Sequence, residues 1–94
     1  MRHRFRWDVA KAASNIWKHG ITFEEAASAF ADPFFRIFPD SAHSFGENRF
    51  VLVGRSDLNR LVVVVHVERS EDKIRIITAR LATRRERFWY EEGR

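Results

Sequence analysis

The sequence contains no cysteine, and it has only two prolines and four glycines among 94 residues. The absence of cysteine excludes disulfide bonds, thiolate metal ligands and cysteine nucleophiles, and it fits a reducing cytosol. The scattered glycines exclude a glycine-rich phosphate loop. No apolar run approaches the roughly 18 residues of a membrane helix, and the charged N-terminus lacks the apolar core of a signal peptide. We therefore expect a cytoplasmic protein without membrane association.

Basic residues are in excess, because 17 Lys and Arg stand against 13 Asp and Glu, for a formal net charge of +4. For a single domain over residues 1–94, this balance favours a polyanionic partner, and nucleic acid is the first candidate. A basic surface that serves solubility alone is the alternative that composition leaves open. The four histidines show no ligand spacing, so we expect neither a metal nor a cofactor.

The run from Phe50 to Ala79 predicts three consecutive β-strands. Its middle segment, 61–68, is β-branched almost throughout and apolar on both alternating faces, which is typical of a central strand. Short polar turns join this segment to the strands 50–53 and 73–79, so we expect an antiparallel meander. The predicted class is α+β, a small antiparallel sheet packed by an N-terminal αα-hairpin and a C-terminal helix.

The predicted hairpin consists of two helices. Asp8 is a candidate N-cap for the first helix, which should end at Gly20. Thr22 and Glu25 form a capping box that opens the second helix. The first helix has an apolar stripe that we expect to face the core, made of Val9, Ala12, Ala13, Ile16 and Trp17. Lys11, Asn15 and Lys18 lie on another face of this helix, where a solvated surface is the simpler interpretation.

Two short strands and a C-terminal helix complete the prediction. Segments 5–7 and 34–38 read as strands, the first of them at an edge of the meander. Thr83 and Glu86 form a second capping box, which opens a helix to about Glu92. Arginines in the first turns of this helix oppose its dipole, and such a broken local rule often marks a functional surface. Pairing of these arginines with acidic residues explains them equally well.

The polar residue types suit metal-free RNA cleavage by the neighbouring 2′-hydroxyl. Glu, His or a neutral Lys can remove the hydroxyl proton, and Arg or Lys can stabilise the charge on the five-coordinate phosphate. His66 shares a strand face with Glu68, although a lone His on an apolar strand is more often a core residue. Glu47 and Arg49 lie where a loop becomes a strand. Tyr90 can stack a base or serve as a partly buried helix residue.

The sequence resembles the BrnT toxins of bacterial type II toxin–antitoxin pairs along nearly its whole length. The resemblance is carried in order by segments 5–8, 18–20, 23–26, 54–56 and 75–80, and by Lys11, Asn15, Glu47, Arg49, Glu86, Arg87 and Tyr90. It implies a RelE-like fold and a ribonuclease that blocks translation by cutting mRNA, free or on the ribosome. It also implies a cognate BrnA-like antitoxin, through which alone the pair binds operator DNA.

The residue patterns and the resemblance together give the expected site. The expected catalytic residues are Lys18, His19, Glu47, Arg49, His66, Arg80 and Tyr90, and the expected RNA-binding residues are Lys11, Arg75, Arg84 and Arg87. The aromatic segment 34–38 is the expected antitoxin contact. The alternative function is a non-catalytic RelE-like module that binds protein or nucleic acid. RNA binding without strand scission would distinguish this alternative.

Overall fold

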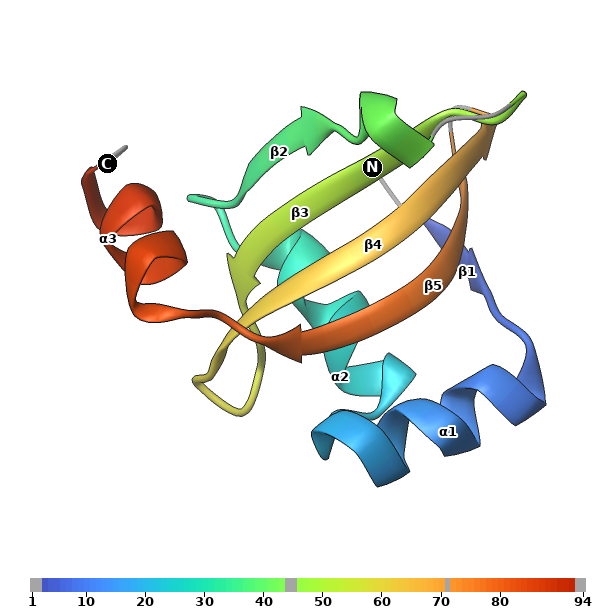
Figure 1. Cartoon of the computed structure of the whole chain (residues 1–94), viewed down its shortest axis with the longest axis horizontal. Helices are drawn as coiled ribbons and strands as arrows, with labels where there is room; N and C mark the ends of the chain where they lie inside the picture. Colours follow the sequence, from blue (N-terminus) through green and yellow to red (C-terminus); the bar gives the residue numbers. More distant parts are fainter. Residues whose placement is uncertain (1–2, 44–45, 71, 93–94) are drawn as a thin grey trace.

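The computed structural model describes residues 3–43, 46–70 and 72–92. The chain order is β1 (Arg4–Arg6), α1 (Val9–His19), α2 (Phe23–Ser28), β2 (Arg36–Pro39), β3 (Arg49–Arg55), β4 (Leu61–Ser70), β5 (Lys73–Leu81) and α3 (Arg84–Glu92). Single 3₁₀ turns span Ala29–Ala31 and Ser41–His43. Figure 1 shows α1 and α2 along one side of the sheet, with α3 set apart beyond the end of β5.

The sheet has the strand order β1-β5-β4-β3-β2, with β4 in its centre as predicted. The pairs β3–β4 and β4–β5 are antiparallel, which confirms the meander, and β2 adds antiparallel to β3. β1 differs from the prediction of a purely antiparallel sheet, because it pairs parallel with β5. Short turns force antiparallel neighbours, whereas most of the chain separates β1 from β5 and leaves their direction open.

Both faces of the central strand are covered, which explains why β4 is apolar on both sides. On the helix face, buried residues of α2 and its flanks pack on the sheet, and this cluster contains Ile21, Phe23, Ala26, Ala29, Leu52, Val62, Val64, Ile76 and Ala79. On the opposite face, α3 covers a smaller cluster of Val53, Leu61, Val63 and Tyr90. The rest of that second face is more open, since Val65 is half-buried and Thr78 is exposed.

The predicted helix caps form. Asp8 Oδ1 accepts from the backbone N–H of Lys11 at 3.0 Å, and Gly20 adopts φ 68° where α1 ends. Thr22 Oγ1 accepts from the N–H of Glu25 at 3.0 Å.

The Glu25 carboxylate departs from the capping-box expectation. It accepts from Ser56 Oγ at 2.6 Å and from Arg60 Nε at 2.9 Å, and Arg60 Nη2 also contacts it. The hydrogen bond from Arg60 lowers the pKa of Glu25, although burial opposes this shift. A buried carboxylate needs such partners, so Glu25 connects α2 to the turn between β3 and β4 rather than to its own helix start.

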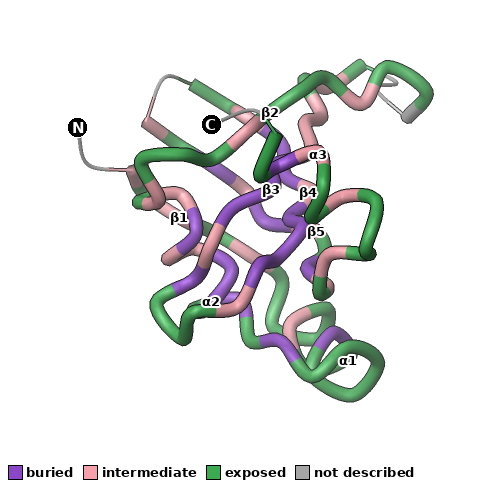
Figure 2. The backbone as a smooth tube through the Cα atoms, turned by 90° about the vertical axis from the view of Figure 1, so that its left-hand side faces the viewer, coloured by how far each residue is buried: buried purple, intermediate pink, exposed green. Residues whose placement is uncertain are grey.

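The apolar stripe of α1 faces outward, so the prediction that it faces the core was wrong except for half-buried Ala12. Val9, Ile16 and Trp17 are 81%, 49% and 88% exposed, and Figure 2 shows most of α1 exposed. Asn15 is the buried residue of this helix. Its Nδ2 donates to the carbonyl oxygens of Ala79 at 2.8 Å and Ile21 at 2.9 Å, and its Oδ1 accepts from the N–H of Ala79 at 3.0 Å. The polar side of α1 is therefore the side that meets β5.

Replacing Asn15 with Leu should destabilise the fold strongly. The substitution removes three hydrogen bonds and leaves backbone groups of Ala79 and Ile21 without that partner. We expect the free energy of unfolding to fall by about 3 kcal/mol, as measured by urea denaturation. Ser14→Ala, at an exposed position of the same helix, is the matched control and should change it by less than about 0.5 kcal/mol. An Asn15→Leu variant as stable as this control would contradict the assignment.

Candidate functional site

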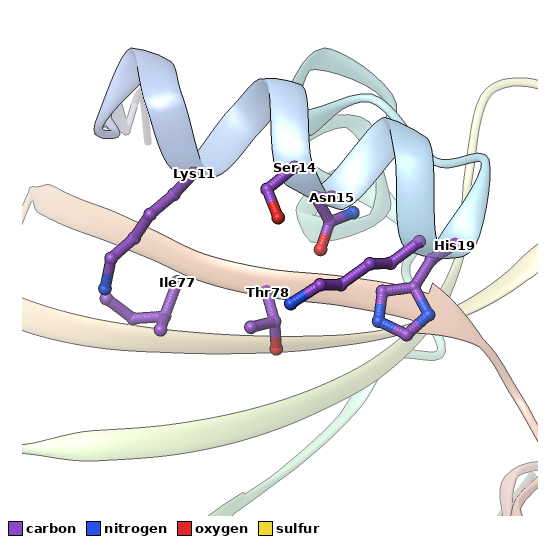
Figure 3. A pocket seen from close by; sticks show the side chains of 7 residues that line it. Lys11, Ser14, Asn15, His19, Ile77 and Thr78 are labelled. Atoms are coloured by element: carbon purple, nitrogen blue, oxygen red, sulfur yellow. The ribbon is translucent and has the colours of Figure 1, made fainter.

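A groove of about 240 Å³ lies between α1 and β5. Its lining consists of Lys11, Ser14, Asn15, Lys18 and His19 from α1 and Ile77 and Thr78 from β5. Figure 3 shows Lys11, Ser14, Asn15 and His19 reaching from α1 toward β5, where Ile77 and Thr78 lie. Among the described residues, this lining holds two lysines and no carboxylate. Such a concave, positively charged surface attracts an anion.

Two local features of the chain build this groove. On α1, the spacing of Lys11, Asn15 and Lys18 places them on one side of the helix, and the Asn15 hydrogen bonds turn that side toward β5. On β5, the register moves from Val65–Thr78 to His66–Ile76, so Ile77 is an extra residue in the ladder. A β-bulge of this kind redirects side chains. Consecutive residues of β5, Ile77 and Thr78, therefore both line the groove.

Arginines lie on the sheet face opposite α2. Arg49 and Arg75 pair with the same β4 residue, and Thr78 and Arg80 pair with β4 residues two and four positions before it. Directly paired residues share a face of a sheet, so these four side chains lie on one face. Arg6 pairs with Arg75 and extends the row to β1. The structure thus brings the predicted Arg49, Arg75 and Arg80 to one surface, which continues to the groove at Thr78.

Arg80 holds a carboxylate. Its Nη1 and Nη2 donate to Glu86 Oε1 and Oε2 at 2.7 Å and 2.8 Å. The hydrogen bonds from Arg80 lower the pKa of Glu86 to about 2, and the same contact raises the pKa of Arg80. Glu86 Oε1 also accepts from the N–H of Thr83 at 2.9 Å, while Thr83 Oγ1 accepts from the N–H of Glu86 at 3.2 Å. The second capping box is confirmed, and Arg80 is anchored to it.

Glu47 lies beside Arg49 but outside the groove. Glu47 Oε1 is 3.5 Å from Arg49 Nη2, and its Oε2 is 3.8 Å from Arg69 Nη2. Glu47 and Arg69 line a separate small pocket together with Glu68. The predicted pair of Glu47 and Arg49 is thus brought together, at the end of the sheet face rather than beside Lys18 and His19.

The structure places His66 and Tyr90 in the core, on opposite faces of the sheet. The His66 ring is fully buried, stacks on Phe50 at 5.9 Å and meets Phe30 edge-on at 4.9 Å. Burial lowers the pKa of His66, although its Nε2 lies 3.4 Å from a carboxylate oxygen of Glu68. Tyr90 is buried as well and donates its hydroxyl to Asp32 Oδ2 at 2.5 Å. Both positions agree with the core alternatives, and the catalytic roles stay predictions.

The remaining predicted RNA-binding residues lie on α3. Arg84 and Arg87 are exposed on α3, away from its buried side. Sequence reasoning missed Ser14, although it lies one turn from both Lys11 and Lys18. It also missed Arg6, which only the pairing of β1 with β5 could reveal. Among the described residues, no group of three or more His, Cys, Asp or Glu is arranged to hold a metal ion, and none of their helices is long and apolar enough to cross a membrane.

Comparison with known proteins shows which family this chain belongs to. The family model described as "Ribonuclease toxin, BrnT, of type II toxin-antitoxin system" matches residues 7–86. The chain belongs to this family. It is therefore a toxin of the ribonuclease type, for which a type II system implies an antitoxin partner and RNA as the substrate. The predicted BrnT resemblance is confirmed.

A solved structure shows the same fold. The 1.1 Å crystal structure of the Brucella abortus ribonuclease toxin BrnT matches with a TM-score of 0.62 and 24% sequence identity, over 87% of this chain and 99% of that chain. The predicted α+β class is thereby confirmed. Comparison with curated proteins gave no match.

The buried His66 should make stability depend on pH. Burial lowers its pKa from the ordinary 6.5, so below that pH the unfolded chain takes up a proton that the folded chain resists. The free energy of unfolding should therefore decrease as the pH falls below 6.5, by up to about 1.4 kcal/mol per pH unit for this group. Urea denaturation between pH 7.5 and 5 would measure this slope. His66→Phe removes the titrating ring, so its free energy of unfolding should depend less on pH. A slope equal to that of the unmodified protein would contradict the prediction.

The Arg80–Glu86 pair should also make the free energy of unfolding decrease as the pH falls, although here the cause is an ion pair rather than burial. Its contribution is fully present above pH 4.5, the ordinary pKa of Glu86, and is lost as the pH falls toward about 2. Since both side chains are partly exposed, we expect Glu86→Gln to cost about 1 kcal/mol at pH 6 and progressively less below pH 4.5. Thermal unfolding across this range measures the difference. Glu91→Gln, exposed on the same helix, is the control. A constant cost at all pH values would contradict the prediction.

Proposed function

We propose that this chain is a metal-independent endoribonuclease that cleaves RNA, thereby inhibits translation in the cytoplasm, and is neutralised by its cognate antitoxin. Membership of a ribonuclease toxin family supplies the reaction class. The observation that carries the proposal is the α1–β5 groove, where Lys11, Lys18 and His19 converge beside Thr78. These residues supply positive charge for a phosphate and a group that can transfer a proton.

The proposed reaction begins at the ribose 2′-hydroxyl. His19 removes the hydroxyl proton, and the 2′-oxygen attacks phosphorus to form the five-coordinate phosphate. The ammonium groups of Lys11 and Lys18 stabilise its additional negative charge. The bond from phosphorus to the 5′-oxygen then breaks, and one of the lysines protonates the leaving oxygen. The products are a 2′,3′-cyclic phosphate and a 5′-hydroxyl.

We assign the base to His19, rather than to Glu47 or His66 as the sequence suggested, because of where these side chains lie. His19 is exposed and lines the groove, whereas His66 is buried on the helix face of the sheet. Glu47 lines another pocket. In this proposal His66 is a core residue without a catalytic role, and Glu47 orients Arg49.

The arginine face guides the RNA toward the groove. Arg75 and Arg80 lie on the same sheet face as Thr78, so phosphates on either side of the scissile bond can follow this row. Arg49 extends the row across the sheet, and exposed Arg84 and Arg87 on α3 offer further contacts. A groove of about 240 Å³ suits a single strand rather than a duplex. Single-stranded RNA is also the form that proteins most often recognise by its bases.

Cleavage should depend on the groove residues. Purified, antitoxin-free protein is incubated with end-labelled RNA in excess chelator, and fragment ends are analysed. We expect 2′,3′-cyclic phosphate ends, and a cleavage rate that falls at least about 100-fold in His19→Gln, because the proton acceptor is lost. Lys18→Gln should also slow cleavage, since it removes charge at the phosphate. Expression of His19→Gln should no longer arrest growth.

Lys73→Gln is the matched control, because it removes one exposed cation of β5 outside the groove. Its cleavage rate should stay within a few-fold of the unmodified protein. Full activity in both groove variants would contradict the assigned site. Intact RNA that still binds the unmodified protein would favour the non-catalytic binding module.

A further inference from the structure

The outward side of α1 carries an apolar surface that the described chain does not cover. We call Val9, Ala10, Ala13, Ile16 and Trp17 the outer stripe. At 100° per residue these five positions span about 120° of the helix circumference. All five are exposed, and Trp17 is the most exposed large apolar side chain among the described residues.

The outer stripe is held in place by the rest of the fold. Asp8 and Gly20 cap the two ends of α1, and Asn15 binds the opposite side of the helix to β5. The helix cannot rotate to bury the stripe without breaking those buried hydrogen bonds. An apolar helix side that is fixed toward solvent marks an interaction surface.

The shape of the outer stripe suits a helix. Ala13 lies between Val9 and Ile16 on one side and Ala10 and Trp17 on the other. Small residues between larger ones allow ridges of a second helix to approach closely. Eleven residues of α1 extend about 16 Å, so a partner helix would contact it over two or three turns. Trp17 has the size and position of an interface anchor.

Charge identifies the kind of partner. The helix Val9–His19 contains Lys11, Lys18 and His19 and no Asp or Glu. The nearest acid, Asp8, is engaged as its N-cap. A second copy of this chain would bring lysines against lysines across a symmetric helix pair, whereas an acidic partner would be attracted.

We propose that the outer stripe is the docking site for an acidic, amphipathic helix of the cognate antitoxin. Apolar side chains of that helix pack on Trp17, and its carboxylates reach Lys18. Lys18 follows Trp17 in the sequence and lies about 100° further round α1. Because Lys18 also lines the groove, docking neutralises the site as well as holding the partner. This mechanism rests on the proposed ribonuclease function, while the docking itself does not.

The segment 34–38, where the sequence led us to expect the antitoxin, has no apolar side chain as exposed as Trp17. Phe34, Phe35, Ile37 and Phe38 are each 40% to 51% exposed, against 88% for Trp17, and Phe38 packs edge-on against Trp89 at 5.3 Å. Pro39 ends β2 and has no N–H to offer an added strand. This surface is therefore the comparison site in the test.

The test compares Trp17→Glu with two variants of other exposed large apolar side chains, Ile37→Glu in segment 34–38 and Phe88→Glu on α3. Binding of each purified variant to the purified cognate antitoxin is measured by calorimetry, and RNA cleavage is measured in chelator. We expect Trp17→Glu to weaken antitoxin binding at least about 30-fold, as loss of an interface anchor does. The antitoxin affinities of Ile37→Glu and Phe88→Glu should stay within a few-fold of that of the unmodified protein. All three variants should cleave free RNA normally, and antitoxin should no longer inhibit Trp17→Glu at concentrations that silence the unmodified toxin.

Several results would overturn the proposal. Unchanged antitoxin affinity in Trp17→Glu would do so, and loss of affinity in Ile37→Glu alone would assign the contact to β2. A concentration-dependent dimer that Trp17→Glu abolishes would identify a second copy as the occupant. Slower RNA cleavage with normal antitoxin binding would identify RNA as the occupant. If the unmodified protein cleaves no RNA, the proposed function fails, but the antitoxin affinities still decide the docking site.

Discussion

The arrangement of this molecule depends on one carboxamide. β1 ends at Arg6, opposite Arg75, so the later part of β5 has no neighbouring strand on that side within the described chain. The Asn15 side chain takes the place of a strand at Ala79, where it both donates and accepts a hydrogen bond. Unpaired backbone groups at a sheet edge invite pairing with other chains, and this contact satisfies two of them. The same contact fixes the rotation of α1, and with it both the cationic groove and the outer stripe.

Local rules predicted the elements well because the relevant contacts are local. The caps at Asp8, Thr22 and Thr83 each join residues three apart, and short turns determine the meander. The rotation of α1 was mispredicted for a different reason. Periodicity shows which side of a helix is apolar, but it does not show what covers that side. The informative residue was Asn15. An Asn in the middle of a helix is unfavourable, because its side chain competes for backbone hydrogen bonds, unless that side chain bonds to a backbone group elsewhere in the fold.

The site was harder to predict because it depends on contacts between distant segments. Asn15 reaches Ala79 across 64 residues, and Tyr90 reaches Asp32 across 58. The first contact creates the groove, and the second takes Tyr90 out of the candidate surface. The bulge at Ile77 was equally invisible, since β5 reads as a regular apolar strand. Sequence reasoning could therefore name Lys11, Lys18 and His19 but not their common groove.

The distribution of carboxylates indicates where an RNA phosphate gains most. Arg80 is already paired with Glu86, which is also bound to the backbone of Thr83, so a phosphate at Arg80 must compete with an anchored anion. Arg49 likewise lies beside Glu47. The described residues that line the groove with Lys11 and Lys18 include no carboxylate, so none of them competes with a phosphate there. The arginines thus suit guidance along the sheet, whereas the groove suits the phosphate at which charge builds up. An acidic partner docked beside Lys18 would supply there the carboxylates that the chain itself lacks.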